Sequence, residues 1–416
     1  MLYYLMLDAK KIRDDFPILK NNPNLIYFDN SASTQKPKQV IEKIKEVYEK
    51  YYANIHRGVY GLSVKSSELY EDSHKEVANF INAKDWREIV FTKNTTEAIN
   101  LIAYSFALNN LRKGDKIVLS IMEHHSNLVP WQFVSKKTGA TLEYIGLTKD
   151  YRLDLNDAEK KIDEKTKIVA ITNMSNVLGT INEVEEIIKI AHEKGAIVVV
   201  DGAQSVPHMK TDVRKIDADF LAFSAHKMLG PSGIGVLYGK KELLEKMDPF
   251  LYGGDMISDV DFNEAYWNEL PWKFEAGTPN ICDGIAFMEA IKYLKNLGME
   301  NVETYERSLV EFFFKRFNEI RDKLGDKIEL IGPNDTKNRG AVFSLFFKDL
   351  HPHFVAKALD LKNIAVRSGY HCAHPLMKYL KIFEKGGTVR ASLYIYNTKE
   401  EIERFFEEIE NILKQH

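Results

Sequence analysis

Lys227 is the residue of this chain whose type and position first suggest covalent chemistry. It comes shortly after an apolar run at residues 219–224, which predicts a buried strand, and before a turn rich in glycine and proline. With Ser224 and His226 beside it, an amine at a strand end is placed to form a Schiff base with an aldehyde cofactor. Glycines of the turn, such as Gly230, would let the backbone approach a bulky ring. The alternative is a solvated loop lysine, which is the commoner situation.

One predicted strand end could bind the phosphate of such a cofactor. Residues 94–97 (Asn-Thr-Thr-Glu) follow a strand and open a helix. Free backbone N–H groups and the hydroxyls of Thr95 and Thr96 would then face one anion. The alternative is a simple helix cap, in which Glu97 closes a capping box.

Three further strand ends carry polar groups. His124, in the run Glu-His-His-Ser-Asn at 123–127, could stack flat on an aromatic ring, although two partly exposed polar residues are the alternative. Asp201 ends the run 197–201, where its carboxylate could pair with a protonated pyridine nitrogen and make the ring an electron sink. An aspartate at this position is more often a turn former. Asn176 follows the next strand upstream of Asp201.

Cys372 is the candidate nucleophile. It lies in a predicted loop after a strand, next to His371 and close to Arg367 and His374. Basic neighbours lower the pKa of a thiol and raise its thiolate fraction, which a nucleophile needs. The alternative is an inert, buried cysteine. Cys282, the second cysteine, begins an apolar helix and is predicted to lie in the core.

Three basic residues are candidates for binding an anionic group. Arg390 lies inside an apolar strand, and a buried arginine needs an anionic partner. That partner could be a substrate carboxylate or a structural aspartate or glutamate. His56 and Arg57 lie in the polar loop 53–58.

The elements that must position these residues alternate between strands and helices, which is typical of a parallel sheet with crossover helices. Ligands bind such sheets at the carboxyl ends of the strands. The predicted strands are 89–92, 116–121, 142–147, 168–172, 197–200, 220–224 and 235–238, and the helices between them are 96–109, 128–137 and 183–194.

The remaining segments predict a second, smaller unit. We expect a large α/β domain at residues 25–270 and a small α+β domain at 271–416 that also includes residues 1–24. In the N-terminal part the predicted elements are a helix at 8–15, a strand at 25–28 and helices at 38–52 and 66–81. In the C-terminal part they are helices at 281–297, 301–324 and 354–361, strands at 328–331, 341–347 and 364–367, and a closing helix from residue 399. Residues 251–271 predict an acidic, aromatic-rich loop.

Composition excludes several classes of protein. The chain has 416 residues, of which 44% are hydrophobic and 28% charged, as in ordinary globular proteins. A net charge of −3 gives no electrostatic reason to expect nucleic acid or an anionic membrane as partner. Two cysteines cannot make a disulfide framework, and no cluster has metal-ligand spacing, so we expect a cytoplasmic protein without metal. The apolar start at residues 1–7 is too short for a signal peptide or membrane anchor.

These motifs together resemble the Suf-type cysteine desulfurases of the class V aminotransferase superfamily. The motifs that carry the resemblance are Asn54-Ile-His-Arg-Gly58, Thr95-Thr-Glu97, Glu123-His-His-Ser-Asn127, Asp201-Gly-Ala-Gln204, Ser224-Ala-His-Lys227, Phe274-Glu-Ala-Gly-Thr278 and His371-Cys-Ala373. The resemblance implies a homodimer of the type I fold of pyridoxal-phosphate-dependent transferases, in which Lys227 holds the cofactor.

The resemblance also implies a role for each site residue. His124 would stack on the cofactor ring, Asp201 would meet the pyridine nitrogen, and Gln204 would meet the phenolate oxygen. Residues expected at the phosphate are Thr95, Thr96, Ser224, His226 and, across the dimer, Thr278. Those expected at or near the substrate carboxylate are Asn176, Arg390, Arg367, His56 and Arg57.

The implied reaction removes sulfur from L-cysteine. Lys227 would move the α-proton, and the Cys372 thiolate would attack the substrate sulfur, which leaves a persulfide on Cys372 and gives alanine. The sulfur would pass to an acceptor protein of iron–sulfur cluster assembly, and selenocysteine lyase activity would accompany it. Two alternatives are another class V reaction, such as cysteine sulfinate desulfination, and a non-catalytic sulfur-relay scaffold.

The chain departs from the usual family pattern close to the thiol. Tyr370 and His374 stand where a histidine and a glutamine are common, and the stretch from residue 372 to 390 is a few residues longer. His353 is a further candidate, because in relatives partnered by a zinc-bearing scaffold a histidine in this setting can contact the partner's metal. A histidine at a helix start is the alternative.

Overall fold

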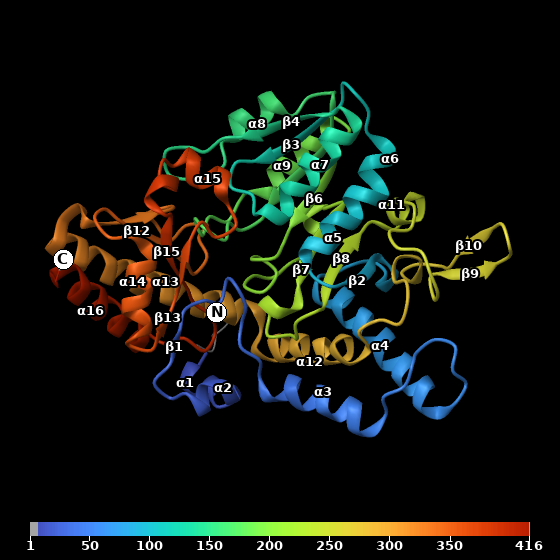
Figure 1. Cartoon of the computed structure of the whole chain (residues 1–416), viewed down its shortest axis with the longest axis horizontal. Coiled ribbons are helices and arrows are strands. Elements are labelled where there is room, and N and C mark those ends of the chain that lie inside the picture. The colour runs from blue at the N-terminus through green and yellow to red at the C-terminus, as the bar shows by residue number, and fades with distance from the viewer. Residues whose placement is uncertain (1–6, 416) are drawn as a thin grey trace, which may run out of the picture.

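The computed structural model describes residues 7–415, so the apolar start at residues 1–6 lies outside the described part. The two larger sheets lie in separate parts of an elongated molecule, with helices around each of them (Figure 1). Among residues 7–415, no helix combines the length and the apolar composition that a membrane-spanning segment requires.

The larger sheet has seven strands in the order β2–β8–β7–β6–β5–β3–β4. All neighbouring pairs are parallel except those of β8, which runs antiparallel to β2 and β7. The mostly parallel, seven-stranded sheet is therefore confirmed, and every predicted strand end lies within two residues of the observed one. The strands are β2 (Ile89–Thr92), β3 (Lys116–Ser120), β4 (Thr141–Ile145), β5 (Thr166–Thr172), β6 (Ile197–Asp201), β7 (Phe220–Ser224) and β8 (Gly235–Gly239).

Both faces of this sheet are buried because successive strand residues point to opposite sides. In β3, Ile117 and Leu119 pack in one apolar cluster with Trp131, whereas Val118 belongs to the cluster on the other face. Helices α5 (Thr95–Ile102) and α7 (Val129–Thr138) contribute to the first cluster, and α9 (Val184–Glu193) and α12 (Ile281–Leu297) to the second.

The predicted helix at 96–109 is divided. It consists of α5, a π-helical stretch at Ala103–Ala107 and α6 (Leu108–Asn110). Short helices that the sequence did not predict include α8 (Leu155–Lys161), α10 (Val213–Ile216) and α11 (Lys241–Lys246). The N-terminal elements are α1 (Ala9–Arg13), α2 (Pro17–Asn21), β1 (Ile26–Tyr27), α3 (Lys38–Lys50) and α4 (Gly61–Phe80), the last of which begins five residues before its predicted start.

The smaller sheet is antiparallel, in the order β11–β12–β15–β14. Its core is aromatic, with Phe313 stacked on Phe343 at a ring distance of 3.6 Å. The predicted strand at 364–367 is interrupted, because β13 pairs with β1 whereas β14 pairs with β15. The elements of this unit are α13 (Met299–Leu324), β11 (Ile328–Ile331), β12 (Val342–Phe347), α14 (Pro352–Asp360), β13 (Ile364–Ala365), β14 (Arg367–Gly369), α15 (His374–Tyr379), β15 (Thr388–Ser392) and α16 (Lys399–Gln415).

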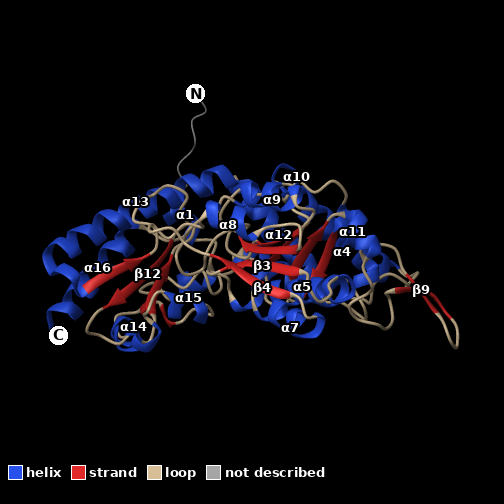
Figure 2. Cartoon of the chain, turned by 90° about the horizontal axis from the view of Figure 1, so that it is seen from above, coloured by secondary structure: helices blue, strands red, loops and turns tan. Residues whose placement is uncertain are grey.

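An antiparallel hairpin replaces part of the predicted loop at 251–271. Strands β9 (Ile257–Val260) and β10 (Ala265–Trp267) project away from the body of the molecule (Figure 2). The prediction of a loop was wrong here because an exposed hairpin buries no apolar face, and so it carries no alternating pattern.

The domain division at residues 25–270 and 271–416 remains a proposal. The separate apolar cluster around the smaller sheet supports it. Helix α12 packs against α3 and α4 in the cluster of the larger sheet, which favours assigning α12 to the large unit. Cys282 at its start is buried, as predicted.

Candidate active site

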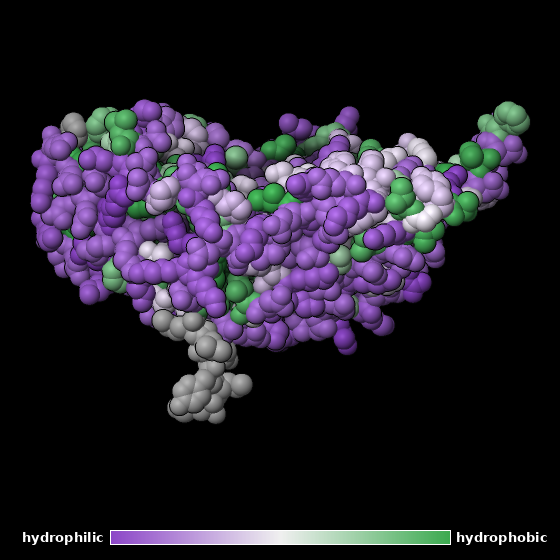
Figure 3. Space-filling view, turned by 90° about the horizontal axis from the view of Figure 1, so that it is seen from below, coloured by the Kyte–Doolittle hydropathy of each residue, from purple (hydrophilic) through white to green (hydrophobic). Residues whose placement is uncertain are grey.

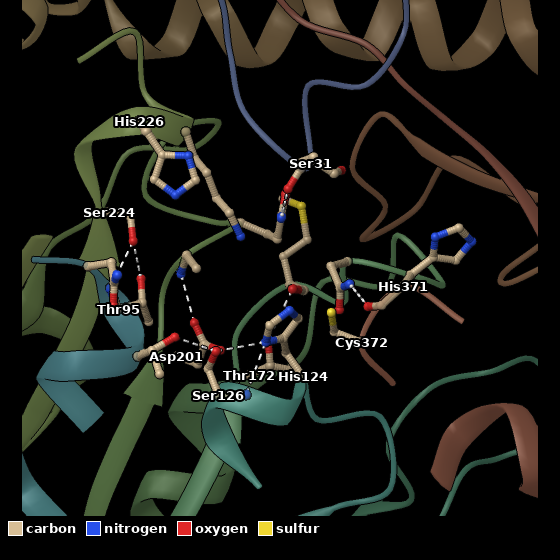
Figure 4. Close-up of a pocket in the computed structure, with 18 of the residues that line it drawn as sticks. Ser31, Thr95, His124, Ser126, Thr172, Asp201, Ser224, His226, His371 and Cys372 are labelled. Carbon is tan, nitrogen blue, oxygen red and sulfur yellow. Dashed lines mark hydrogen bonds between the residues drawn. The ribbon is translucent and has the colours of Figure 1, made fainter. Parts of the chain in front are cut away.

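One cavity of about 370 Å³ lies where the strand ends of the larger sheet meet the smaller unit (Figure 4). It brings together twelve of the residues predicted for the site. These are Thr95, Thr96, His124, Asn176, Asp201, Gln204, Ser224, His226, Lys227, Arg367, Cys372 and Arg390. Ser31, Ser126 and Met174 also line the cavity, and the sequence reasoning did not predict them.

Lys227 ends a 3₁₀ turn, Ala225–Lys227, that directly follows β7. The turn is fixed through the carbonyl of His226, which accepts hydrogen bonds from the backbone N–H of Thr34 (3.0 Å) and from Lys36 Nζ (3.1 Å). Burial lowers the pKa of Lys227 to about 8, although the carboxylate of Asp201 acts in the opposite direction. A substantial share of this amine is therefore neutral near physiological pH, as a nucleophilic amine requires.

The glycines after Lys227 do not line the cavity, so the prediction that they make room for a ring was wrong. A Cβ on Gly235 would lie 2.4 Å from Cα of Asn94, and one on Gly230 would lie 2.8 Å from the ring of Phe287. Gly235 therefore lets the antiparallel strand β8 approach the start of α5.

The start of α5, where the sequence predicts an anion site, lines the cavity. Asn94 caps the helix, because its side chain accepts from the backbone N–H of Glu97 at 3.0 Å. The hydroxyl of Ser224 accepts from the backbone N–H of Thr95 at 2.8 Å, and Thr96 Oγ1 lies 2.7 Å from the hydroxyl of Ser126. Glu97 accepts from the N–H of Lys93 and not from that of Asn94, so no reciprocal capping box forms. Both the cap and the cavity-lining hydroxyls are present.

Burial shifts the pKa values of His124 and Asp201, the two side chains expected to meet a pyridine-type ring. The Nδ1 atom of His124 accepts from the backbone N–H of Ser126 at 3.1 Å. Burial, followed by the charge of Lys227, lowers the pKa of His124 to about 3, so its ring is neutral. Burial raises the pKa of Asp201, while the N–H of Ala203 (2.9 Å) and Lys227 oppose this shift.

Pyridoxal phosphate fits this donor set. Gln204 donates from Nε2 to the carbonyl of Ser31 at 2.7 Å, while its buried Oε1 has no partner within residues 7–415. Buried polar atoms are normally hydrogen-bonded, and a ligand in the cavity can supply the missing donor. The helix start with its hydroxyls suits a phosphate, and the Asp201 carboxylate suits a pyridinium nitrogen.

Arg390 is buried on β15 and has a structural partner that the sequence reasoning did not identify. Its Nη1 donates to the carbonyl of Asn176 at 3.0 Å, and its Nη2 lies 3.4 Å from the carboxylate of Asp29. Arg367 binds the same carboxylate more closely, at 2.7 Å. Burial lowers the pKa of Arg390 to about 10, against the charge of Asp29, so it stays cationic at neutral pH. The sequence feature that could have marked Asp29 as a site residue is its position directly after a predicted strand.

Cys372 is a free, exposed thiol at the cavity wall. His371 and Cys372 both adopt left-handed backbone conformations, with φ of 50° and 56°, which are unfavourable for residues with side chains. Residues from the larger unit hold both peptide groups. Asn176 Nδ2 donates to the carbonyl of His371 and the backbone N–H of His125 donates to that of Cys372, both at 2.8 Å.

His56, Arg57 and Thr278 do not reach this cavity within the chain. All three are exposed, and His56 packs on Trp272 at a ring distance of 4.3 Å. Their roles at the phosphate and the substrate stay predictions.

Glu275, which the sequence reasoning did not single out, is buried just before Thr278. Its carboxylate accepts from the backbone N–H of Phe91 (2.7 Å) and from the Tyr70 hydroxyl (3.0 Å), and it pairs with His74 Nε2 (2.8 Å). This network attaches the segment that carries Thr278 to strand β2 and helix α4.

Curated relatives match the chain over nearly its full length. The probable cysteine desulfurase of Halalkalibacterium halodurans is 48% identical over 400 residues, which cover 95% of this chain and 96% of the relative. The cysteine desulfurase of Haloferax volcanii is 44% identical over 420 residues, which cover 97% and 96%.

Solved structures match equally well. The apo structure of the cysteine desulfurase from Thermococcus onnurineus NA1 has a TM-score of 0.92 at 46% identity and covers 99% of both chains. The S-sulfonic acid form of the cysteine desulfurase CsdA from Escherichia coli has a TM-score of 0.88 at 34% identity, covering 99% of this chain and 100% of that one. The predicted α/β fold of pyridoxal-phosphate-dependent transferases is thereby confirmed. The family model described as aminotransferase class-V matches residues 26–405, and the chain belongs to this family.

Proposed function

We propose that this protein is a pyridoxal-phosphate-dependent cysteine desulfurase, which converts L-cysteine to L-alanine and keeps the sulfur as a persulfide on Cys372. The observation that carries the proposal is that a buried lysine with a pKa of about 8 and a free, exposed thiol line the same cavity. The names of the two relatives and the two solved structures described above agree with it.

Pyridoxal phosphate, when bound, serves as an electron sink for the substrate carbon next to the amino group. Lys227 would carry it, Asp201 would hold its ring nitrogen, and His124 would cover its ring. Gln204 would bind its phenolate oxygen. The groups that would hold its phosphate are Thr95, Thr96, Ser224, His226 and, from the second subunit of a dimer, Thr278.

The side chains of this chain account for the proton and sulfur steps. With a pKa of about 8, Lys227 Nζ can take up the α-proton and return it near neutral pH. The Cys372 thiolate then attacks the substrate sulfur. The bond between Cβ and sulfur breaks, its electron pair stays with Cβ, and Cβ takes a proton to give the methyl group of alanine. Arg390 and Asn176 would bind the substrate carboxylate, with Arg367 nearby.

A homodimer is part of the proposal. Large apolar side chains are exposed on the loop between α3 and α4 and on the hairpin, where Val59 is 96% exposed and Phe262 is fully exposed. Exposed apolar patches of this kind mark interfaces. Both segments lie at the same end of the molecule, and the hairpin tip is apolar (Figures 1 and 3). The loop carries His56 and Arg57, which a second subunit could use.

The wider role follows from the chemistry of the persulfide. A persulfide on an exposed cysteine can pass its sulfur to an acceptor protein, and we place the enzyme in cytoplasmic iron–sulfur cluster assembly. His353 is exposed and bonded to Ser368 through Nδ1 (2.7 Å), so its Nε2 faces away from that bond and stays available to a partner. Selenocysteine lyase activity is part of the same proposal, because selenium would occupy the position of sulfur.

The test is to incubate the cofactor-loaded protein with L-cysteine and to measure alanine and protein-bound persulfide together. We expect equal amounts in the first turnover. The Cys372→Ser variant should bind the cofactor yet form neither product. Alanine from this variant with cysteine sulfinate but not cysteine would support sulfinate desulfination instead, and a protein that binds no cofactor would support a scaffold role.

A further inference from the structure

Two peptide groups beside the thiol are held in an unfavourable conformation. We call residues 370–374 the thiol loop. The left-handed φ values of His371 and Cys372 cost free energy unless neighbouring groups hold them in place. The loop therefore needs fixed partners if Cys372 is to stay at the cavity wall.

His125 contacts the thiol loop at two points, Cys372 and His374. Its backbone N–H donates to the carbonyl of Cys372 at 2.8 Å. Its ring Nε2 accepts from the backbone N–H of His374 at 3.2 Å and lies 3.0 Å from the ring Nδ1 of the same residue. Since a backbone N–H can only donate, Nε2 of His125 must be unprotonated and act as the acceptor.

The features that depart from the family pattern meet in the same place. The ring of Tyr370 stacks on Phe383 at 4.4 Å, with 15° between the planes. The ring of His374 lies 4.8 Å from Tyr370 and 4.7 Å from His125. Phe383 belongs to the longer stretch between the thiol and Arg390. These side chains thus form one cluster beside the thiol loop, defined by His125, Tyr370, His374 and Phe383.

His125 also directly follows His124, which lines the cavity. One short segment after β3 therefore positions the ring of His124 and, through His125, the backbone of the thiol loop. A displacement of about 1 Å in a reacting group can cost up to a hundredfold in rate. Loss of the acceptor at Nε2 would therefore change the distance between the thiol and a substrate in the cavity.

We infer that His125 is a positioning residue, whose Nε2 accepts the His374 N–H and thereby holds Cys372 where it can attack the substrate sulfur. This inference rests on the proposed function. It concerns the sulfur-transfer step alone, because His125 contacts the thiol loop and does not line the cavity.

The experiment compares two amide variants that differ only in reach. In His125→Gln the amide oxygen can occupy the position of Nε2, whereas in His125→Asn it falls short and the acceptor is lost. We expect His125→Asn to lower kcat at least about tenfold, with KM for L-cysteine unchanged within about twofold. His125→Gln should retain most of the wild-type kcat.

A second readout follows the thiol itself. Because Cys282 is buried, alkylation by iodoacetamide reports on Cys372, and its rate should change several-fold in His125→Asn but not in His125→Gln. Equal kcat for wild type and His125→Asn, equal loss in both variants, or loss of bound cofactor in His125→Asn would each overturn the inference. If the wild-type protein forms no persulfide, the proposed function fails instead, which distinguishes the two.

Discussion

The protonation of Lys227 in the cofactor-free protein provides the sharpest test of the site. Burial lowers its pKa to about 8, and two charged neighbours act in opposite directions, with Asp201 raising it and Arg390 lowering it. At pH 7, about a tenth of such an amine is neutral, against roughly one part in 3,000 for an ordinary lysine. At pH 7, Lys227 should therefore react with a small aldehyde roughly two- to three-hundredfold faster than the same amine would with the ordinary pKa of lysine.

The sign of each perturbation follows from these charges. As pH rises toward about 8, Lys227 loses its proton, so its reaction rate should rise and then level off above that pH. The Asp201→Asn variant removes the carboxylate that stabilises the ammonium, so the midpoint should move to lower pH. Arg390→Gln removes a repelling cation, so the midpoint should move to higher pH.

The assay is reductive alkylation of the cofactor-free protein with formaldehyde between pH 6 and 10, with each lysine quantified by peptide mass. Exposed lysines serve as internal references, and their rates should still rise near pH 10. A midpoint near 10 for Lys227, or a shift of both variants in the same direction, would refute the reasoning.

Three further predictions each concern a single substitution. Glu275→Ala leaves His74 and two other buried donors without their acceptor, so the free energy of unfolding in urea should fall by about 3–5 kcal/mol. The control is Glu269→Ala on the surface, which should change this free energy by less than about 0.5 kcal/mol. Gly235→Ala places a Cβ 2.4 Å from the backbone of α5's cap and should weaken cofactor binding measured by titration, whereas Gly253→Ala, with open space around it, should not. Phe262→Ser should raise the dimer dissociation constant in sedimentation at least about tenfold without loss of helix content, and an unchanged constant would contradict a role of the hairpin in the dimer.

The larger sheet could be predicted because its strands are short, β-branched and buried on both faces. The prediction of strands in the smaller unit was less complete, since β13 pairs outside the smaller sheet with β1, a segment more than 330 residues away in the chain. Hairpin β9–β10 left no pattern, because its side chains are mostly exposed. The predicted start of helix α4 was five residues too late. The helix begins at Gly61 without a capping side chain, so no cap residue marks its start in the sequence.

Site residues at strand ends could be predicted because the parallel sheet brings strand ends together. Lys227, Asp201 and His124 follow this rule. The roles of Asp29 and Glu275 could not be predicted, because each acts through partners distant in sequence: Arg367 and Arg390 for Asp29, and Phe91 for Glu275. Likewise, the need for glycine at position 235 could not be predicted, because Gly235 packs closely against the helix start at Asn94, some 140 residues upstream.

Asn176 shows why the substrate and the thiol cannot be treated separately. Arg390 donates to the backbone carbonyl of Asn176. The side-chain amide of Asn176 in turn donates to the carbonyl of His371, next to Cys372. The same two residues, Arg390 and Asn176, are those proposed for the substrate carboxylate. A carboxylate bound there would contact the groups that hold one side of the thiol loop, while His125 holds the other. With the proposed function, the distance from substrate sulfur to Cys372 would therefore depend on hydrogen bonds to the backbone of the thiol loop.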